Sequence, residues 1–230
     1  MIMMIRKSTC YFAFLSLFFL ILAIDTSTKL ILGNPKVSKQ ETATNFHSEF
    51  LKIFSLGQKR LLSSLLWTRT LLESDLDHYA SRDLNSWLFL RFKTIVNLDP
   101  NFYEAYLYGG QYLSIIKDDI EGASVLYQEG LKKYPDDYWL NYHAGYHFLY
   151  EMKDFKRAKI SYTRLSKFPN ILSRFPLLPK ILARIEDETS ESSEAVTILL
   201  KAYKDLPEDH PLKSAYEKAI KKRGGKIPPP

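Results

Sequence analysis

Apolar residues recur at the spacing of an α-helix along most of the chain after residue 45. The first such stretch runs from Phe46 to about Leu72, and the second runs from Leu84 to Asn97. Apolar positions three and four residues apart form one stripe on each helix, and such a stripe packs against a neighbour. Polar residues 73–83 separate the two stretches. The pattern therefore predicts a pair of packed helices joined by a polar connection.

The clearest pattern lies between residues 100 and 169, where a sequence unit occurs twice with a period of 35 residues. A repeat of this length is typical of stacked helical hairpins, because a single hairpin cannot bury its own apolar face. The matching pairs are Pro100 and Pro135, Tyr103 and Tyr138, Gly110 and Gly145, Asp119 and Asp154, Ala123 and Ala158, and Tyr127 and Tyr162. We expect helices over about 102–116 and 119–133 in the first unit, and the pair before it reads as a weaker copy.

Steric requirements of helix packing explain why these residue types recur at these positions. Gly110 lets two helices approach closely, Ala123 is the small residue opposite it, and Tyr127 fills the gap to the next hairpin. Pro135 ends the second helix of the unit. We expect N-terminal helix caps at three polar residues beside these prolines, namely Asn101, Asp136 and Asp137.

A third and weaker copy follows, with its second helix marked by Ala195, Leu199, Ala202 and Pro207. Its first helix is expected at about 176–188. A last helix over 210–223 has apolar residues on one side and mostly Lys and Glu on the other, as expected for a solvated cap. We expect the helical-repeat domain to cover residues 46–223 and residues 224–230 to form a disordered tail.

The amino terminus has a different pattern. Arg6 and Lys7 precede an uncharged apolar run from Ser8 to Ile24, whose length in a helix, roughly 25 Å, is the short end of a bilayer crossing. A cleaved secretory signal is the alternative, but the small-residue cleavage pattern is absent because Ile21 lies two places before Ala23. We favour an uncleaved signal anchor over residues 1–24, a transmembrane helix followed by a linker over 25–45. A short N-terminal tail in the cytosol would place the body outside it, in the periplasm if the source is a bacterium.

Composition narrows the possible partners and reactions. The 32 basic and 26 acidic residues are interspersed, and the dense basic cluster is terminal, so nucleic acid is not expected as a partner. The single cysteine, Cys10, excludes an intramolecular disulfide and a structural cysteine-based metal site. There is no glycine-rich phosphate loop and no nucleophile elbow in the sequence. We expect no cofactor and no small-molecule substrate.

Two clusters could still carry chemistry. His143, His147 and Glu151 lie four residues apart on one helix and include possible Zn²⁺ ligands, although surface histidines on a helix are the simpler interpretation. Asp75, with Asp77 and His78 close by, could suggest acid–base chemistry, but it lies in a predicted connection where a solvated turn is the simpler interpretation. We therefore expect neither a metal site nor an enzyme.

The glycine, alanine, tyrosine and proline pattern of residues 100–207 resembles the tetratricopeptide repeat (TPR). Two features depart from that family: its usual tryptophan is Tyr106 in one copy and Asn141 in the other, and the unit is one residue longer than the usual period of about 34 residues. The resemblance implies a right-handed superhelix with a concave groove lined mainly by the first helix of each hairpin. It also implies scaffolding of peptide segments or partner helices, and no catalysis.

By the register of that family, nine residues would face the groove and bind a partner protein. They are Glu104, Leu107, Tyr108, Gln111, Trp139, Tyr142, Tyr146, Leu149 and Tyr150. Aromatic side chains with a phenolic hydroxyl suit peptide binding. The alternative is that the tyrosines at every fourth position from Tyr138 to Tyr150 pack between helices.

Together these patterns predict an all-α, TPR-like solenoid of three to four hairpins, preceded by one transmembrane helix. The function we expect is that of a membrane-anchored adaptor that mediates protein–protein interaction in a larger envelope complex. The alternative is a structural subunit of a membrane-associated assembly that packs along its whole surface.

Overall fold

The computed structural model describes residues 38–189 and 192–227. The chain divides into two compact units, Met1–Thr42 and Ala43–Pro230. In the first unit the described residues contain the short helix α2 (Lys39–Thr42). Across the described ranges of both units there are α-helices and two π-helical turns, η1 and η2, and no strand. The predicted all-α class is confirmed.

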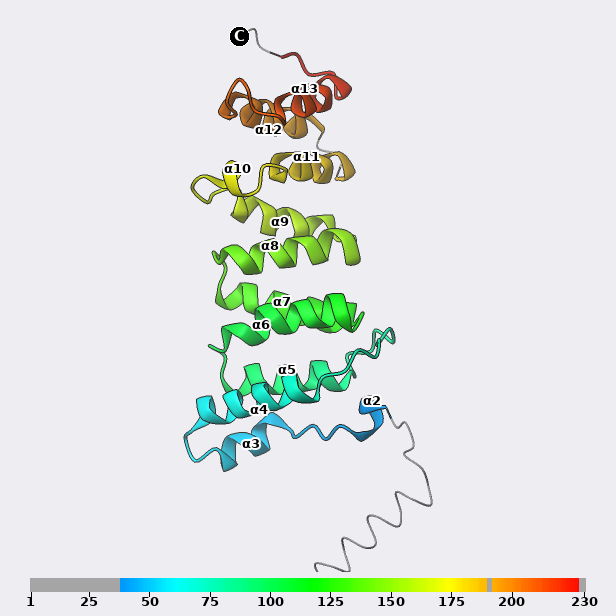
Figure 1. The fold of residues 1–230 in the computed structure, drawn as a ribbon, viewed down its shortest axis with the longest axis vertical. Helices are drawn as coiled ribbons and strands as arrows, with labels where there is room; N and C mark the ends of the chain where they lie inside the picture. The colour runs from blue at the N-terminus through cyan, green and yellow to red at the C-terminus, as the bar shows by residue number, and fades with distance from the viewer. Residues whose placement is uncertain (1–37, 190–191, 228–230) are drawn as a thin grey trace, which may run out of the picture. The chain divides into compact units, whose positions relative to one another are not determined.

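The helices of the second unit stack in chain order, as Figure 1 shows. They are α3 (Ser48–Phe54), α4 (Lys59–Glu73), α5 (Trp87–Leu98), α6 (Tyr103–Gln111), η1 (Tyr112–Ile116), α7 (Ile120–Lys133), α8 (Tyr138–Tyr146), η2 (His147–Glu151), α9 (Phe155–Leu165), α10 (Ile171–Arg174), α11 (Leu178–Glu188), α12 (Ser192–Asp205) and α13 (Lys213–Lys222). Four pairs pack as hairpins: α4 with α5, α6 with α7, α8 with α9, and α11 with α12. Each hairpin contacts the next, and α13 packs on α12.

The stretch from Phe46 to Leu72 forms two helices instead of the one we predicted. α3 and α4 are separated by the turn 55–58, where Leu56 has φ 47° and Gly57 has φ 85°. Two successive residues in the left-handed region cannot continue a right-handed helix, and the apolar spacing does not reveal this break. The following helix starts at Trp87, later than predicted, because Ser86 caps it by accepting a hydrogen bond from the Phe89 N–H at 3.0 Å.

The extra residue of each repeat lies in a π-helical turn. α6 continues as η1, and α8 continues as η2 exactly one repeat later in the sequence. The Lys117 N–H donates to the carbonyl of Tyr112 at 3.0 Å, and the Met152 N–H donates to the carbonyl of His147 at 3.1 Å. Each hydrogen bond spans five residues where an α-helix spans four, so one additional residue is accommodated without ending the helix.

The turn that follows each π-helical segment is also repeated. Asp118 and Lys153 have φ values of 58° and 53°, which redirect the chain into the second helix of the hairpin. The carboxylates of Asp119 and Asp154 then accept the third backbone N–H beyond them, each at 2.9 Å. Such N-caps satisfy donors that the first helical turn leaves free.

The predicted caps beside the prolines are only partly right. Asp137 caps α8, since its carboxylate accepts the Leu140 N–H at 2.8 Å. Asp136 is exposed and Asn101 does not cap α6, whose preceding residue is Phe102 with no side-chain cap. The backbone N–H of Asn101 instead donates to the carboxylate of Asp99 at 3.0 Å, which stabilises a turn before the helix.

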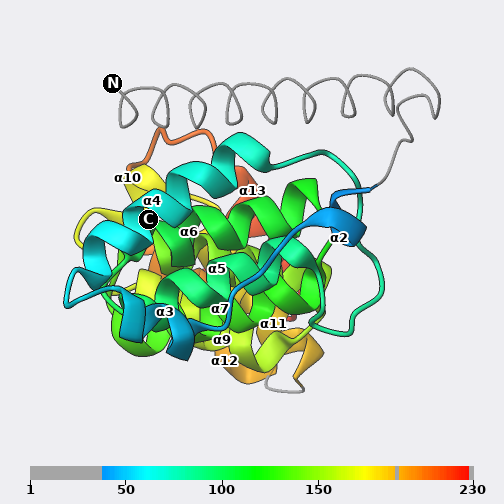
Figure 2. The ribbon, with the colours of Figure 1, turned by 90° about the horizontal axis from the view of Figure 1, so that it is seen from below.

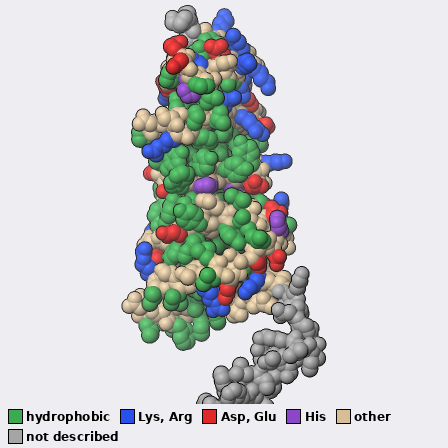
Figure 3. Space-filling view, in the orientation of Figure 1, with side chains coloured by type: hydrophobic (Ala, Val, Ile, Leu, Met, Phe, Trp, Pro, Cys, Tyr) green, Lys and Arg blue, Asp and Glu red, His purple; other side chains and the backbone are tan. Residues whose placement is uncertain are grey.

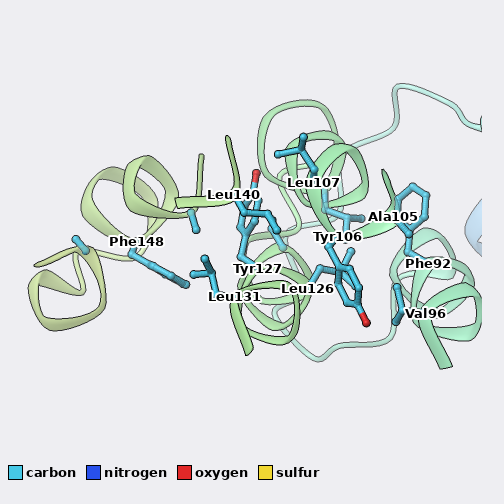
Figure 4. Packing of buried hydrophobic residues seen from close by; sticks show 14 of the residues in the cluster. Phe92, Val96, Ala105, Tyr106, Leu107, Leu126, Tyr127, Leu131, Leu140 and Phe148 are labelled. Atoms are coloured by element: carbon cyan, nitrogen blue, oxygen red, sulfur yellow. The ribbon is translucent and has the colours of Figure 1, made fainter. Parts of the chain in front are cut away.

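A continuous apolar core joins the hairpins from Trp87 to Ile185, and a smaller cluster lies under α12 and α13. Figure 4 shows Tyr127 beside Leu131 of its own helix α7 and Leu140 of the next helix, α8. A Cβ atom on Gly110 would lie 2.6 Å from the Tyr127 ring, and one on Gly145 would lie 2.8 Å from the Tyr162 ring. The glycine of each repeat therefore contacts its tyrosine directly, across the two helices of one hairpin.

The apolar run 8–24, which we predicted to be a membrane anchor, lies outside the described residues, as do residues 25–37 of the linker and 228–230 of the tail. Within the part of the chain that the structure describes, no helix has the length and apolar character required to cross a bilayer.

Candidate functional site

Four large aromatic side chains are exposed on α6, α8 and η2. The exposed fractions are 53% for Tyr108, 55% for Trp139, 47% for Tyr146 and 40% for Tyr150. Monomeric proteins rarely leave such side chains in water at a cluster of neighbouring positions, and aromatic residues are enriched where proteins bind one another. This group is the strongest candidate for a binding surface in the first helices of the hairpins.

The 35-residue shift relates the two halves of this surface. It places Glu104 on Trp139, Tyr108 on His143, Gln111 on Tyr146, and Ile115 on Tyr150. Ile115 is itself 66% exposed, and α6 packs against α8. We call Tyr108, Ile115, Trp139, His143, Tyr146 and Tyr150 the aromatic face. Ile115 and His143 were not among the predicted groove residues, although the repeat shift alone would have identified them.

Contacts between neighbouring rings hold the exposed side chains of α8 in place. The Trp139 ring stacks on His143 at a centroid distance of 6.2 Å and meets Tyr142 edge-on at 6.3 Å. Tyr146 and Tyr150 lie 4.8 Å apart. Rings that are already ordered lose less conformational entropy when a partner binds.

The tyrosines at every fourth position of α8 and η2 divide into two groups. Tyr138 and Tyr142 are partly buried, and they pack edge-on against Phe168 and Phe175 at 5.5 and 5.2 Å. Tyr146 and Tyr150 are exposed. Packing between helices therefore accounts for the first two rings and leaves the last two available to a partner.

The nine predicted groove residues are not equally accessible. Glu104, Tyr108, Trp139, Tyr146 and Tyr150 are exposed, and Gln111 and Tyr142 are partly buried. Leu107 and Leu149 are core residues with exposed fractions of 4% and 3%, so we correct their assignment to a surface. Leu107 lies in α6 and Leu149 in η2, and both side chains pack into the apolar core that joins the hairpins.

His147 is buried beneath this surface. Its Nδ1 lies 2.8 Å from the Ser114 hydroxyl, which belongs to the equivalent π-helical turn of the preceding hairpin. Its ring packs against Tyr127 at a centroid distance of 5.4 Å. Burial lowers the pKa of His147 from 6.5 to about 4, because the low-dielectric core disfavours the charged imidazolium. The residue is therefore a neutral core histidine that joins two hairpins.

We expect this histidine to make the fold sensitive to acid. The unfolded chain protonates His147 below its ordinary pKa of 6.5, whereas the folded chain does so only near 4. Unfolding therefore takes up a proton between these values, and the free energy of unfolding falls as the pH falls from 6.5 to 4. The contribution is up to about 3 kcal/mol, at roughly 1.36 kcal/mol per pKa unit.

Denaturant unfolding at a series of pH values measures this effect. In His147→Gln, the change in unfolding free energy over that window should shrink by most of His147's contribution. His78→Gln is the matched control, because His78 is exposed. An unaltered pH profile in His147→Gln would contradict the assignment.

The clusters considered for catalysis are dispersed or used for structure. No group of three or more His, Cys, Asp or Glu side chains within the described ranges is placed to hold a metal ion. His147 bonds to Ser114, and His143 lies against Trp139, so they do not converge with Glu151. Asp75 is partly buried and forms an ion pair with the buried ammonium of Lys117, whereas Asp77 and His78 are exposed, as predicted for a solvated turn.

A second surface feature lies between α9, α11 and α12. It is a hollow of about 360 Å³ with an apolar floor that includes Ile171, Leu182 and Ile198. Lys159 bridges its rim to Glu186 at 2.8 Å. The hollow could accept an apolar side chain, but it lacks the group of exposed aromatic rings found on α6 and α8.

Comparisons of the chain with protein-family models, with curated proteins and with solved structures found no match. The functional interpretation therefore depends on the geometry of the chain itself.

Proposed function

We propose that residues 46–223 form a TPR-like superhelical solenoid and that the protein is a membrane-anchored adaptor. The support for the solenoid is the consecutive packing of hairpins together with the repeated contact of Gly110 with Tyr127 and of Gly145 with Tyr162. The support for the anchor is the apolar run 8–24 that precedes the helices. In this proposal the body lies outside the cytosol, in the periplasm if the source is a bacterium, and belongs to a larger envelope complex.

The aromatic face is the observation that carries the adaptor proposal. Trp139, Tyr146 and Tyr150 are exposed, and each contacts a neighbouring ring. In the preceding hairpin the exposed Tyr108 and Ile115 lie at the positions equivalent to His143 and Tyr150. Interfaces obtain most of their binding energy from a few such aromatic anchors. The expected partner is a protein segment that presents apolar side chains to these rings, while phenolic hydroxyls bind its polar groups.

Trp139→Ala and Tyr146→Ala should each weaken partner capture by about tenfold or more, since truncating an aromatic anchor typically costs about 2 kcal/mol or more. Both side chains are about half exposed, at 55% and 47%, so the helical circular dichroism signal should remain. The measurement is capture of partner proteins by the full-length chain in membranes, quantified by mass spectrometry. Ile160→Ala is the control, because Ile160 is exposed at 54% on α9, outside the aromatic face.

Proteins retained by the wild type and by Ile160→Ala, but lost from both aromatic variants, would support the proposal. Equal retention by all four chains would refute the aromatic face as the binding surface. Global unfolding of both aromatic variants would show that these rings stabilise the core.

The structural-subunit alternative is favoured by apolar side chains exposed outside the aromatic face, including Ile160 at 54% and Leu177 at 45%. An assembly that packs along the whole solenoid would cover them as well. Ile160→Ala would then lose partners to the same extent as Trp139→Ala, so the same experiment separates the two functions.

A further inference from the structure

The turn between α3 and α4 presents apolar side chains to solvent at its tip. Ile53, Phe54 and Leu56 are exposed by 75%, 64% and 89%. Leu56 and Gly57 have left-handed conformations, which interrupt the helical course between α3 and α4. Figure 2 shows the turn protruding at the margin of the stack. A protrusion of this kind is not a groove, because it has no walls that could enclose a partner's side chain.

Basic side chains surround the tip. Lys52 precedes it, and Lys59 and Arg60 follow it at the start of α4. Lys59 and Arg60 are exposed, and Arg60 lies 3.9 Å from the carboxylate of Asp99 at the end of α5. The one acidic residue of the segment 48–60, Glu49, is bonded to Lys52 at 2.6 Å, so three basic side chains face one acidic side chain and the segment carries a net positive charge. An apolar tip within a basic rim is complementary to a bilayer surface that carries anionic lipids, which attract Lys and Arg and accept apolar side chains below the headgroups.

The two ends of the helical stack differ in the side chains that they expose to solvent. At the other end, α13 exposes Ser214, Lys218, Lys221 and Lys222, as a terminal helix in water should. The α3–α4 end exposes Phe50, Leu61, Leu65 and Leu72 in addition to the tip residues. Figure 3 shows hydrophobic side chains gathered at this end of the second unit. Solvent alone therefore does not account for the composition of the α3–α4 end.

We propose that the α3–α4 turn inserts Ile53, Phe54 and Leu56 into the interfacial region of a bilayer that contains anionic lipids. The proposal builds on the membrane anchor proposed above. Residues 25–47 connect the apolar run to α3, and a chain of that length spans at most about 80 Å when fully extended. A body on so short a connection stays close to the bilayer, where the protruding tip can insert and restrict the orientation of the solenoid.

A fluorescent probe at the tip tests this insertion in the full-length chain. Cys10 is the single cysteine, so Cys10→Ser gives a background in which Leu56→Cys can be labelled with the polarity-sensitive fluorophore NBD. The labelled chain is reconstituted into vesicles of phosphatidylcholine and phosphatidylglycerol. Ser214→Cys in the same background is the matched control, because Ser214 is exposed on α13.

We expect the probe at residue 56 to emit at shorter wavelength than the probe at 214. Lipids that carry a nitroxide should quench the probe at residue 56 several-fold more than the probe at 214. Aqueous iodide should quench the probe at residue 56 several-fold less than the probe at 214. Quenching by iodide to the same extent at both positions would overturn the proposal. A blue-shifted probe that nitroxide lipids do not quench would also overturn it, because the tip would then be covered by protein, such as a second copy.

Vesicle flotation after an alkaline wash separates this proposal from that of the anchor. If the chain floats after the wash but its tip probe is in water, the anchor is supported and the inserted turn is refuted. If nitroxide lipids quench the probe before the wash but the chain no longer floats after it, the inserted turn is supported and the anchor is refuted. A chain that never associates with vesicles overturns both.

Discussion

Replacing Tyr127 by alanine is expected to destabilise the folded chain by about 3–5 kcal/mol, the usual cost of truncating a large buried aromatic side chain. The Tyr127 ring is 1% exposed and belongs to the core that joins the four hairpins. Removing it leaves a void that Gly110 has no side chain to fill. Denaturant unfolding followed by far-ultraviolet circular dichroism measures the loss. A cost below about 1 kcal/mol, as for surface substitutions, would contradict this packing.

The opposite substitution tests the same contact from the other helix. Gly110→Ala should destabilise by about 1–3 kcal/mol through overpacking, because its Cβ would lie 2.6 Å from the Tyr127 ring. Helix propensity opposes this effect by about 1 kcal/mol at most. In Gly110→Ala/Tyr127→Leu the penalty for the alanine should largely disappear, since contacting residues are not additive. Gly145→Ala, opposite Tyr162, is the matched test in the next hairpin, and stabilisation by both alanines would rule out the contact.

The arrangement of glycine and tyrosine could be anticipated because it depends on local helical spacing. Gly110 and Tyr127 recur as Gly145 and Tyr162, and the hairpins containing them lie where the repeat predicted them. The steric assignment was incomplete, because Tyr127 and not Ala123 lies closest to Gly110. Which of two residues on one helical stripe meets a given neighbour depends on how the helices cross, and one sequence does not specify that crossing.

The residues of the candidate site were also predicted only in part. Trp139 and Tyr146 are exposed as expected of groove residues, whereas Leu107 of α6 and Leu149 of η2 are buried in the core. The 35-residue period indicated an extra residue, but not that a five-residue hydrogen bond would accommodate it. π-Helical turns occur frequently at functional sites, and here they carry Ile115 and Tyr150 of the aromatic face. The widened turns thus change which side chains the first helix of each hairpin presents.

Contacts between residues distant in sequence were the least accessible to prediction. Asp75 and Lys117 are 42 positions apart and form an ion pair. The Lys117 side chain is only 3% exposed and that of Asp75 is 22% exposed. Two backbone groups strengthen the contact, since the Tyr112 hydroxyl donates to the Asp75 carbonyl at 3.1 Å and the Tyr79 N–H donates to the Lys117 carbonyl at 2.6 Å. The connection after α4 is thereby held against the end of η1.

Asp75→Ala is accordingly expected to destabilise the chain by about 3–5 kcal/mol, because it leaves the Lys117 ammonium buried without its counter-charge. Asp75→Ala/Lys117→Met removes both charges and should recover most of that loss, since an apolar replacement of a buried pair is often close to neutral. Glu208→Ala is the control for an exposed pair: the Glu208 side chain is 88% exposed beside Lys213, and its loss should cost less than about 1 kcal/mol. Unfolding free energies of the four chains measure the comparison.

If Asp75→Ala behaves like Glu208→Ala, Lys117 has access to water and the connection is not held by this pair. If the double variant is as unstable as Asp75→Ala, the loss comes from packing around Asp75 and not from an unpaired charge.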